Sequence, residues 1–372
     1  MVNFNLSILY LASLVCISII IINPLTSELL FINNNNLKKG LDTMSMNSNI
    51  QARPYTPLKD SELFPFTSRI NHSEIWHSAM VDESGFERVS QTYIDKFESN
   101  AGKKLALVVF SNHWYTGISF PSSMANIAKQ NDAVPIIRMG PWKSNGLSLL
   151  DAGPYTMTNI ATGQHDTALK EWAKQAKDFG SPILVDFGYE ANNNYFPWSK
   201  QGASAYIDAY RHIINLFRQQ STTNVYFVYH PDLGSNPDNM KQWYPGDEYI
   251  DWILASAYGD DGNIGSLGVL QKYYGKLAAI SASKPLGIEE WGIGSPKDTK
   301  DTLDALAQNK FPRIKILSIW NEAPTIAMGS MGSMGSMEDR RIDKSPEMLN
   351  AYRTGIANPI YLSANFNPNP NY

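Results

Sequence analysis

Two glutamates follow short apolar stretches of the chain, where a strand of a buried sheet would end. Glu190 lies in "DFGYEANNNYFPW" (residues 186–198), and Glu290 lies in "KPLGIEEWG" (residues 284–292). Two carboxyl groups facing each other across a cleft suit glycoside hydrolysis, because one can donate a proton while the other attacks the anomeric carbon. A single strand-end glutamate is weak grounds, and Glu190 alone could be a surface carboxylate in a loop. The pair, surrounded by Trp and Asn, is a stronger signal.

Eight short apolar runs of the sequence predict the buried strands that would position these glutamates. Amphipathic stretches lie between most of them, and the segment after the fifth run is mostly irregular, so its helix should be short or missing. The predicted strands are Ile75–Val81, Leu105–Phe110, Val134–Met139, Ile183–Phe187, Val225–Tyr229, Ile250–Ala257, Leu286–Glu290 and Ile314–Trp320; the predicted helices are Phe86–Ser99, Ser122–Asn131, Asp166–Phe179, Ala203–Gln220, Ser266–Ile280, Thr299–Gln308 and Pro346–Ile356.

Alternating strands and helices predict a parallel sheet, and eight such units predict a (β/α)8 TIM barrel with a single catalytic domain. A doubly wound open sheet is the alternative, but no Gly-rich phosphate loop follows the first strand. In a (β/α)8 barrel the active site lies at the carboxyl ends of the strands. Glu190 and Glu290 end the fourth and seventh strands, so they should meet at the barrel mouth.

Composition supports one large folded domain and excludes several other classes of protein. The 372 residues are 43% apolar and 18% charged, with a net charge of −4. The sequence has no stripe of basic residues of the kind that predicts binding to nucleic acid. Cys16 is the single cysteine, so there is no disulfide framework. The six histidines show no metal-ligand spacing, and we expect neither metal nor cofactor. The "MGSMGSMGSM" stretch (residues 328–337) is interpreted as a low-complexity insertion rather than a copper(I) site.

The first 22 residues are apolar and contain no Lys, Arg, Asp or Glu. Residues 6–22 approach the length of a membrane span, so we expect either a signal peptide or an N-terminal membrane anchor over residues 1–24. A buried core helix is the alternative, but the segment precedes a linker and not a domain. We expect a linker at 25–60, the barrel domain at 61–360 and an irregular tail at 361–372. The protein should then be secreted or anchored at the outer face of the cell membrane, and monomeric.

One long segment resembles a known family. "GQHDTALKEWAKQAKDFGSPILVDFGYEANNNYFPW" is similar to the family 26 glycoside hydrolases, which are best known for β-mannanases and some β-glucanases. The likeness runs from about Ile75 to Ile356 and includes "WYPGDEYIDWILASAYG", "KPLGIEEWG" and "DRRIDKSPEMLNAYR". The residues of the long segment that match the family pattern are Gly163, Asp166, Trp172, Glu190, Asn192, Pro197 and Trp198.

The resemblance implies a retaining mechanism with a polysaccharide substrate. It assigns Glu190 as the general acid/base and Glu290 as the nucleophile, and it matches Tyr258 to a tyrosine that hydrogen-bonds the nucleophile. Because side chains alternate along a strand, we expect Glu289 to point away from Glu290, toward the helical layer or a loop. Glu289 as nucleophile is the alternative.

Aromatic rings pack on the apolar faces of sugar rings and amides bond their hydroxyls, so residues near the strand ends are candidates for substrate binding. Trp320 matches an aromatic residue that forms the floor of the sugar-binding site in the family. For each tryptophan the alternative is core packing, and for His113 and Trp114 it is a structural role. The candidates are Tyr189, Asn192, Trp198, Trp320, Trp142, Trp291, His113 and Trp114. Arg138, His230 and Asp232 are nearby polar residues, interpreted as carboxylate-orienting or loop-fixing groups.

Three positions around Glu190 depart from the family pattern. Tyr189 replaces the usual His, Asn193 replaces Gly and Tyr195 replaces Trp. Tyrosine cannot carry a charge at neutral pH as histidine can, so we expect substrate choice to differ here. The first hypothesis is a retaining, endo-acting, mannanase-like glycoside hydrolase on β-mannan or β-glucan. The second is a catalytically decayed barrel that binds polysaccharide or serves the cell envelope.

Overall fold

The computed structural model divides the chain into two compact units, residues 1–58 and 59–372. The structure describes residues 21–22, 29–30, 74–82, 88–143, 151–234, 236–259, 265–292, 294–322 and 339–363. Within the first unit it describes only β1 (Ile21–Ile22) and β2 (Leu29–Leu30), which pair antiparallel. The expected signal or anchor, the linker and the Met-rich stretch lie almost entirely outside these described residues. Among the described residues no helix combines the length and apolar character needed to cross a membrane.

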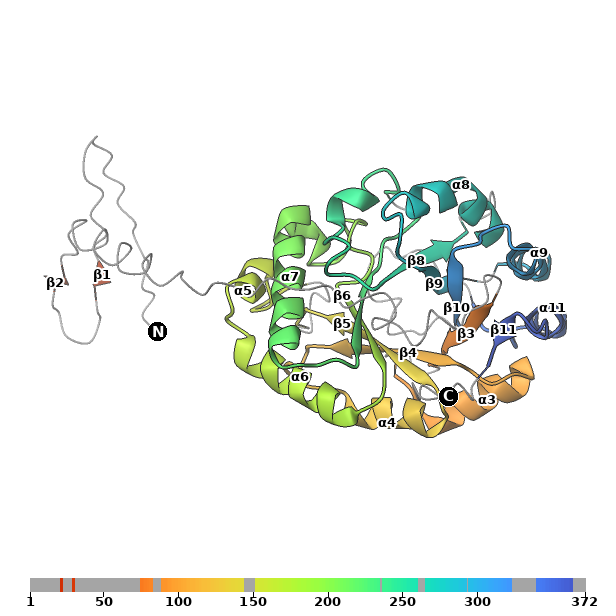
Figure 1. Cartoon of the computed structure of the whole chain (residues 1–372), viewed down its shortest axis with the longest axis horizontal. Helices are drawn as coiled ribbons and strands as arrows, with labels where there is room; N and C mark the ends of the chain where they lie inside the picture. The colour runs from red at the N-terminus through yellow and green to blue at the C-terminus, as the bar shows by residue number, and fades with distance from the viewer. Residues whose placement is uncertain are drawn as a thin grey trace, which may run out of the picture. The chain divides into compact units, whose positions relative to one another are not determined.

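The second unit is a closed barrel of eight parallel strands (Figure 1). Neighbouring strands pair in sequence order, and the last pairs with the first through Ile316–Trp76 to Trp320–Met80. This confirms the predicted (β/α)8 barrel. The strands are β3 (Ile75–Met80), β4 (Leu107–His113), β5 (Val134–Gly140), β6 (Ile183–Phe187), β7 (Val225–Tyr229), β8 (Trp252–Tyr258), β9 (Leu286–Gly292) and β10 (Ile314–Trp320).

The helices form a layer around the strands (Figure 1). Several begin at the capping residues that favour helix starts: Ser295 and Ser345 accept a backbone N–H, and each is followed by a proline. This Ser-Pro start explains why the seventh-strand helix begins three residues before the predicted Thr299. The helices are α3 (Gln91–Ala101), α4 (Ser122–Gln130), α5 (Met157–Ala161), α6 (Asp166–Phe179), α7 (Ala203–Gln219), α8 (Ser266–Ala278), α9 (Pro296–Ala307) and α11 (Pro346–Ile356), with 3-10 turns η2 (Ser199–Gln201) and η3 (Met240–Trp243).

Three small elements, η3, α5 and β11, can be compared with the elements predicted from the sequence. Between β7 and β8 the described residues form one helical element, the short η3, so the prediction of a short or missing helix is confirmed. The short helix α5 was not predicted. Residues Tyr361 and Leu362, expected in an irregular tail, instead form β11, which pairs parallel with the start of β3. Tyr361 is buried and its hydroxyl donates to Leu303 O at 2.7 Å, so the barrel unit extends past residue 360.

Apolar side chains fill two separate layers of the barrel. One cluster lies between strands and helices, and the other lines the barrel interior, where Trp76 and Trp252 approach with ring centroids 6.1 Å apart. Toward the carboxyl ends of the strands the barrel interior becomes polar and charged, because Arg138, Asp186 and Glu289 are buried there. The apolar floor therefore supports a polar, charged upper layer.

His77 on β3 provides a pH-dependent contribution to stability. It is fully buried, with Nε2 2.8 Å from the Tyr352 hydroxyl and Nδ1 3.0 Å from Lys104 O. Burial lowers the pKa of His77 to about 4, while an unfolded chain keeps a histidine pKa of about 6.5. The unfolded state therefore binds this proton first as the pH falls.

We expect this difference to remove about 3 kcal/mol of stability as the pH drops from 6.5 through 4. The variant His77→Gln should therefore show a flatter dependence of unfolding free energy on pH in that window, measured by urea titration. Above pH 7, where both states hold the residue neutral, the slopes of variant and wild type should coincide. An unchanged slope between pH 4 and 6.5 would contradict the assignment.

Candidate active site

The backbone after β6 takes an unusual path that presents Glu190. Gly188 and Glu190 both have left-handed φ angles, 62° and 51°. At Gly188 a Cβ atom would lie 2.9 Å from the Tyr206 ring, so only glycine fits. A glutamate at positive φ costs on the order of 1–3 kcal/mol, and such strain is concentrated at functional sites. The loop is held in place by Ala191 N, which donates to His230 O at 3.2 Å.

The Glu190 carboxyl is only partly exposed and has one close amide neighbour. Asn193 Nδ2 donates to Glu190 Oε2 at 2.9 Å, and Asn193 N donates to Glu190 O at 3.0 Å. Burial raises the pKa of Glu190 well above its ordinary value, and the charges of Glu290 and Asp232 raise it further. Asn193, which in the sequence was only a departure from the family pattern, is therefore a contact of the candidate acid.

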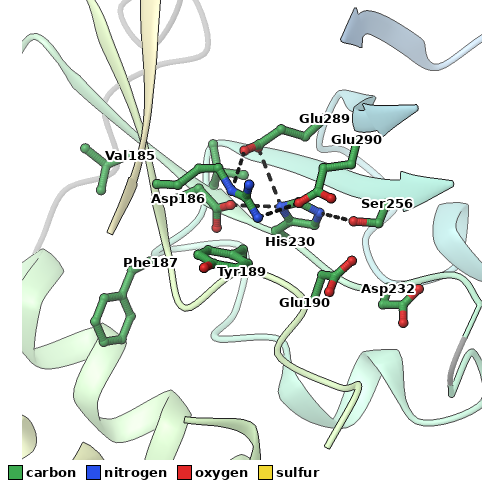
Figure 2. Close-up of polar contacts among 12 residues, drawn as sticks. Val185, Asp186, Phe187, Tyr189, Glu190, His230, Asp232, Ser256, Glu289 and Glu290 are labelled. Carbon is green, nitrogen blue, oxygen red and sulfur yellow. Dashed lines mark hydrogen bonds and ion pairs between the residues drawn. The ribbon is translucent and has the colours of Figure 1, made fainter. Parts of the chain in front are cut away.

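A β-bulge in β9 turns both of its glutamates inward. Against β8, Ala255 pairs with Ile288 and Ser256 pairs with Glu290, so Glu289 has no partner of its own. The expectation that Glu289 points to the helical layer is wrong, because the extra residue breaks the alternation on which it rested. Glu289 lies inside the barrel 3.8 Å from Arg138 Nε, and Glu290 lies beside it (Figure 2).

Glu290 is buried and held by two donors at the barrel mouth. The Tyr258 hydroxyl, at the end of β8, donates to Glu290 Oε2 at 2.6 Å. Arg138 Nη2, from β5, donates to Glu290 Oε1. Hydrogen bonds and an opposite charge both favour the ionised carboxylate. The expected contact between Tyr258 and Glu290 is therefore present in the structure.

Arg138 is the central cation of the site and rests on aromatic rings. Its guanidinium carbon lies 3.7 Å from the centre of the Tyr189 ring and 5.1 Å from that of Trp320. The Tyr189 hydroxyl lies 3.2 Å from His113 Nε2. Only 2% of Tyr189 is exposed, so its main partner is Arg138 rather than solvent. Tyr189 thus takes part in positioning the charge on Glu290 and offers almost no surface to a ligand.

A second polar group lies beneath Glu290 in the barrel interior. His230 Nδ1 is 2.8 Å from Asp186 Oδ2, and His230 Nε2 is 2.8 Å from Ser256 Oγ (Figure 2). Asp186, His230 and Glu289 offer potential metal-ligand atoms within 4.8 Å of one another. His230 was interpreted as a loop-fixing residue; the structure instead places its ring inside the barrel.

Several predicted substrate-binding residues lie away from the mouth. Trp291 stacks on Tyr352 of α11, because the bulge at Glu289 turns the next side chain outward. Trp114 packs on Phe187 under the helices, and Trp198 donates from Nε1 to Tyr189 O at 2.8 Å. None of these three indoles has exposed surface. The expectation that they contact sugar is not met by this arrangement, in which core packing is their role.

Asn192 also has a structural role. It is buried, its Nδ2 donates to Asp232 O and to Asn236 O at 3.0 Å each, and its Oδ1 accepts from Asp232 N at 2.8 Å. These bonds join the loop after β6 to the loop after β7. Asn192 therefore fixes Glu190 and Asp232 relative to each other, which is a positioning role rather than a sugar contact.

The remaining candidates do lie together near Arg138 and Glu290. His113 and Trp142 pack at 5.1 Å between ring centroids, and Trp320 lies over Arg138. Tyr115, which was not among the predicted residues, packs beside both, with ring centroids 5.0 Å from His113 and 5.6 Å from Trp142. Tyr115 is 39% exposed, more than these neighbours. The repeated aromatic pattern of "HWY" was its signal in the sequence.

We expect Tyr258→Phe to lower kcat by about 10- to 100-fold, since a hydrogen bond to a charged group contributes about 1.5–3 kcal/mol. Steady-state rates on an accepted polysaccharide measure this. Tyr244→Phe is a matched control, because it removes a tyrosine hydroxyl bond to Asp247 at 2.7 Å on an exposed part of the unit. Equal rates for Tyr258→Phe and wild type would refute a role for this hydroxyl in holding Glu290.

A closed (β/α)8 barrel with acidic side chains at the carboxyl ends of β6 and β9 has the architecture of barrel enzymes that act on ligands held at that face. Residues 112–287 match the family model of glycosyl hydrolase family 26. This match covers a little under half of the chain and shows a similarity to that family.

Among curated proteins, endoglucanase H of Acetivibrio thermocellus is 27% identical over 283 residues, which cover 72% of this chain and 29% of that protein. This chain therefore spans less than a third of that relative's length. Among solved structures, a β-mannanase from a symbiotic protist of the termite Reticulitermes speratus is similar with TM-score 0.59 and 18% identity, over 83% of this chain and 95% of that one.

A modular endo-β-1,4-mannanase from Cellulomonas fimi is similar with TM-score 0.62 and 15% identity, over 84% of this chain and 77% of that one. At these identities the likeness to the two mannanase structures establishes the barrel fold.

Proposed function

We propose that this protein is a retaining, endo-acting β-glycoside hydrolase on a polysaccharide such as β-mannan or β-glucan, with Glu190 as acid/base and Glu290 as nucleophile. The observation that carries the proposal is the different treatment of the two carboxyls. Glu290 receives hydrogen bonds from Tyr258 and Arg138, whereas burial and neighbouring negative charge raise the pKa of Glu190. Glu290 has the hydrogen-bond donors that a nucleophilic carboxylate needs, and Glu190 has the raised pKa that a proton donor needs, which is the division of roles in retaining hydrolysis.

In the first step, Glu190 gives its proton to the glycosidic oxygen that leaves. A Glu290 oxygen forms a bond to the anomeric carbon as the bond to the leaving oxygen breaks. In the second step, the Glu190 carboxylate takes a proton from water, whose oxygen attacks the same carbon and releases Glu290. Each step inverts the anomeric carbon, so the product keeps the original configuration.

The substrate class follows from the aromatic residues at the mouth and from the named activities of the relatives. His113, Tyr115 and Trp142 form one aromatic group, and the Trp320 ring centre lies 5.1 Å from the Arg138 guanidinium carbon. Aromatic rings of this kind suit the apolar faces of pyranose units. An endoglucanase and endo-β-1,4-mannanases among the relatives support endo action on a β-linked glucan or mannan.

Proton NMR of an early reaction mixture tests the mechanism. With a β-linked polysaccharide identified from a substrate panel, the β-anomer of the new reducing end should appear first and the α-anomer should follow by mutarotation. Early α-anomer would rule out retention. Binding of polysaccharide with no hydrolysis of any panel member would instead favour the decayed-barrel hypothesis, a binding or cell-envelope protein.

We also propose that the enzyme acts outside the membrane, either secreted or anchored through residues 6–22, and as a monomer. The support for the location is the apolar, uncharged N-terminal run. Fractionation of cells expressing the full chain, with protease added to intact cells, distinguishes these sites. Protection of the barrel from protease in intact cells would overturn the proposal.

A further inference from the structure

Beneath the candidate active site four ionisable side chains meet inside the barrel. One is Arg138 from β5. The other three, labelled in Figure 2, are Asp186 from β6, His230 directly after β7 and Glu289 from the bulge in β9. Each is at least 98% buried. We call these residues the interior cluster. Arg138 also donates a hydrogen bond to Glu290. A change of charge in the interior cluster can therefore act on the proposed nucleophile through the Arg138 guanidinium.

The carboxyl groups of the cluster lack the donors that buried anions need. Among the described residues, no hydrogen-bond donor reaches Asp186 Oδ1 or either oxygen of Glu289. The basic nitrogen atoms beside Glu289 are Arg138 Nε at 3.8 Å and His230 Nδ1 at 3.7 Å, both beyond hydrogen-bond distance. A buried carboxylate in this state costs several kcal/mol, and taking up a proton removes that cost.

The charges facing the cluster do not balance if every carboxyl is ionised. Glu290, Glu289 and Asp186 surround the one guanidinium of Arg138, and Glu190 and Asp232 add negative charge from the mouth. Burial lowers the pKa of His230, so its ring is not a second cation at neutral pH. Burial raises the pKa of Asp186 to about 8, against the opposing effect of the Arg138 charge. Burial likewise raises the pKa of Glu289.

A metal ion is the other way to satisfy Asp186, His230 and Glu289, and the geometry disfavours it. The separation of 2.8 Å between His230 Nδ1 and Asp186 Oδ2 is that of a hydrogen bond. Two ligand atoms each about 2 Å from a tetrahedral ion lie more than about 3 Å apart. Arg138 also places a positive charge beside Glu289, which repels a cation.

We propose that Asp186 and Glu289 share a proton at neutral pH, so that Glu289 is neutral beside Arg138 and the guanidinium charge is directed to Glu290. His230 fixes the pair from the other side, because its ring joins Asp186 to Ser256. Asp186 and Glu289 are then positioning residues that act through Arg138. The role assigned to Glu290 rests on the proposed function, whereas the shared proton does not.

Infrared difference spectra test the proton directly, without any activity. At pH 7, subtracting the double variant Asp186→Asn, Glu289→Gln from wild type should leave a carboxylic-acid C=O band that shifts in D2O. Glu98→Gln is the matched control, because Glu98 is buried in an ion pair with Lys104 and should leave only carboxylate bands. If the double variant does not fold, the spectrum of the single variant Glu289→Gln is subtracted from that of wild type, and the same carboxylic-acid band is expected. Only carboxylate bands in that difference, or one metal ion per chain by elemental analysis, would overturn the proposal.

Kinetics test whether the pair acts through Arg138. Glu289→Ala should lower kcat at least tenfold with KM within twofold, because Arg138 loses its neutral neighbour. Glu289→Gln, which keeps the shape and the neutral charge, should restore kcat to within threefold of wild type. A glutamine variant as inactive as the alanine variant would mean that Glu289 works as an anion. Full activity in both would mean that the pair positions nothing. Absence of hydrolysis in wild type would instead refute the proposed function and leave the infrared result standing.

Discussion

Replacing Glu290 with alanine should abolish hydrolysis while sugar binding survives. We expect kcat to fall by on the order of 10⁴-fold or more, because no covalent intermediate can form without this carboxylate. The fold should persist, since Glu290 lies at the barrel mouth, where Arg138 and Tyr258 bond its side chain. Initial rates, together with calorimetric titration of an oligosaccharide, measure the two effects separately.

The adjacent glutamate provides the comparison for this prediction. Glu289 shares the bulge, the burial and the contact with Arg138, yet only Glu290 is bonded by Tyr258. A small anion such as formate should partly restore turnover in Glu290→Ala by entering the vacated space. Full activity in Glu290→Ala would refute its assignment as nucleophile.

Replacing Glu190 with glutamine should lower kcat on a polysaccharide by about 10²- to 10⁴-fold, the usual contribution of a general acid. Glu190 must be protonated to act, and burial with the charge of Glu290 raises its pKa. Wild-type activity should therefore persist into neutral pH and decline as the pH rises through that raised pKa. In Glu190→Gln this alkaline decline should disappear, because glutamine does not titrate.

A substrate with a good leaving group separates the two functions of Glu190. An aryl glycoside whose phenolate leaves without a proton should lose far less of its first-step rate in Glu190→Gln than the polysaccharide does. Equal losses on both substrates, or an alkaline limb that survives in the variant, would contradict the role of Glu190 as proton donor.

The barrel and the carboxyl pair could be predicted because both depend on local patterns. Apolar runs such as Ile183–Phe187, Val225–Tyr229 and Ile314–Trp320 match the observed strands residue for residue. The position of Glu190 after its strand then follows from the rule that barrel sites lie at carboxyl ends. The contact of Tyr258 with Glu290 followed from the resemblance to a family, not from any local pattern.

The orientation of side chains at the strand ends could not be predicted in the same way. Alternation predicts that Glu289 and Glu290 face opposite sides, but one unpaired residue in β9 turns both inward and sends Trp291 outward. A bulge depends on pairing with both neighbouring strands, which are far away in sequence. The predicted sugar contacts of Trp114 and Trp198 differ from the observed core packing for a related reason. Both residues lie in loops after a strand, where side-chain direction follows no fixed period.

Asp186 has a signal in the sequence, although it is not among the predicted site residues. It is a charged residue inside the apolar run "ILVDF", at a position where alternation directs it into the barrel. Buried acids are rare unless paired. Its partners, His230 and Glu289, come from other strands, so the cluster becomes visible only when the barrel closes.

The interior cluster also limits how heat-resistant this barrel can become. Replacing a buried ionic group by apolar residues of similar volume is often neutral or stabilising by about 1–4 kcal/mol. Substitutions at Asp186, His230 and Glu289 are thus the ones that a search for thermostable variants should enrich. The same substitutions would remove the polar side chains beside Arg138, including its contact with Glu289. Selection for resistance to heat and selection for turnover should therefore favour opposite residues at these three positions.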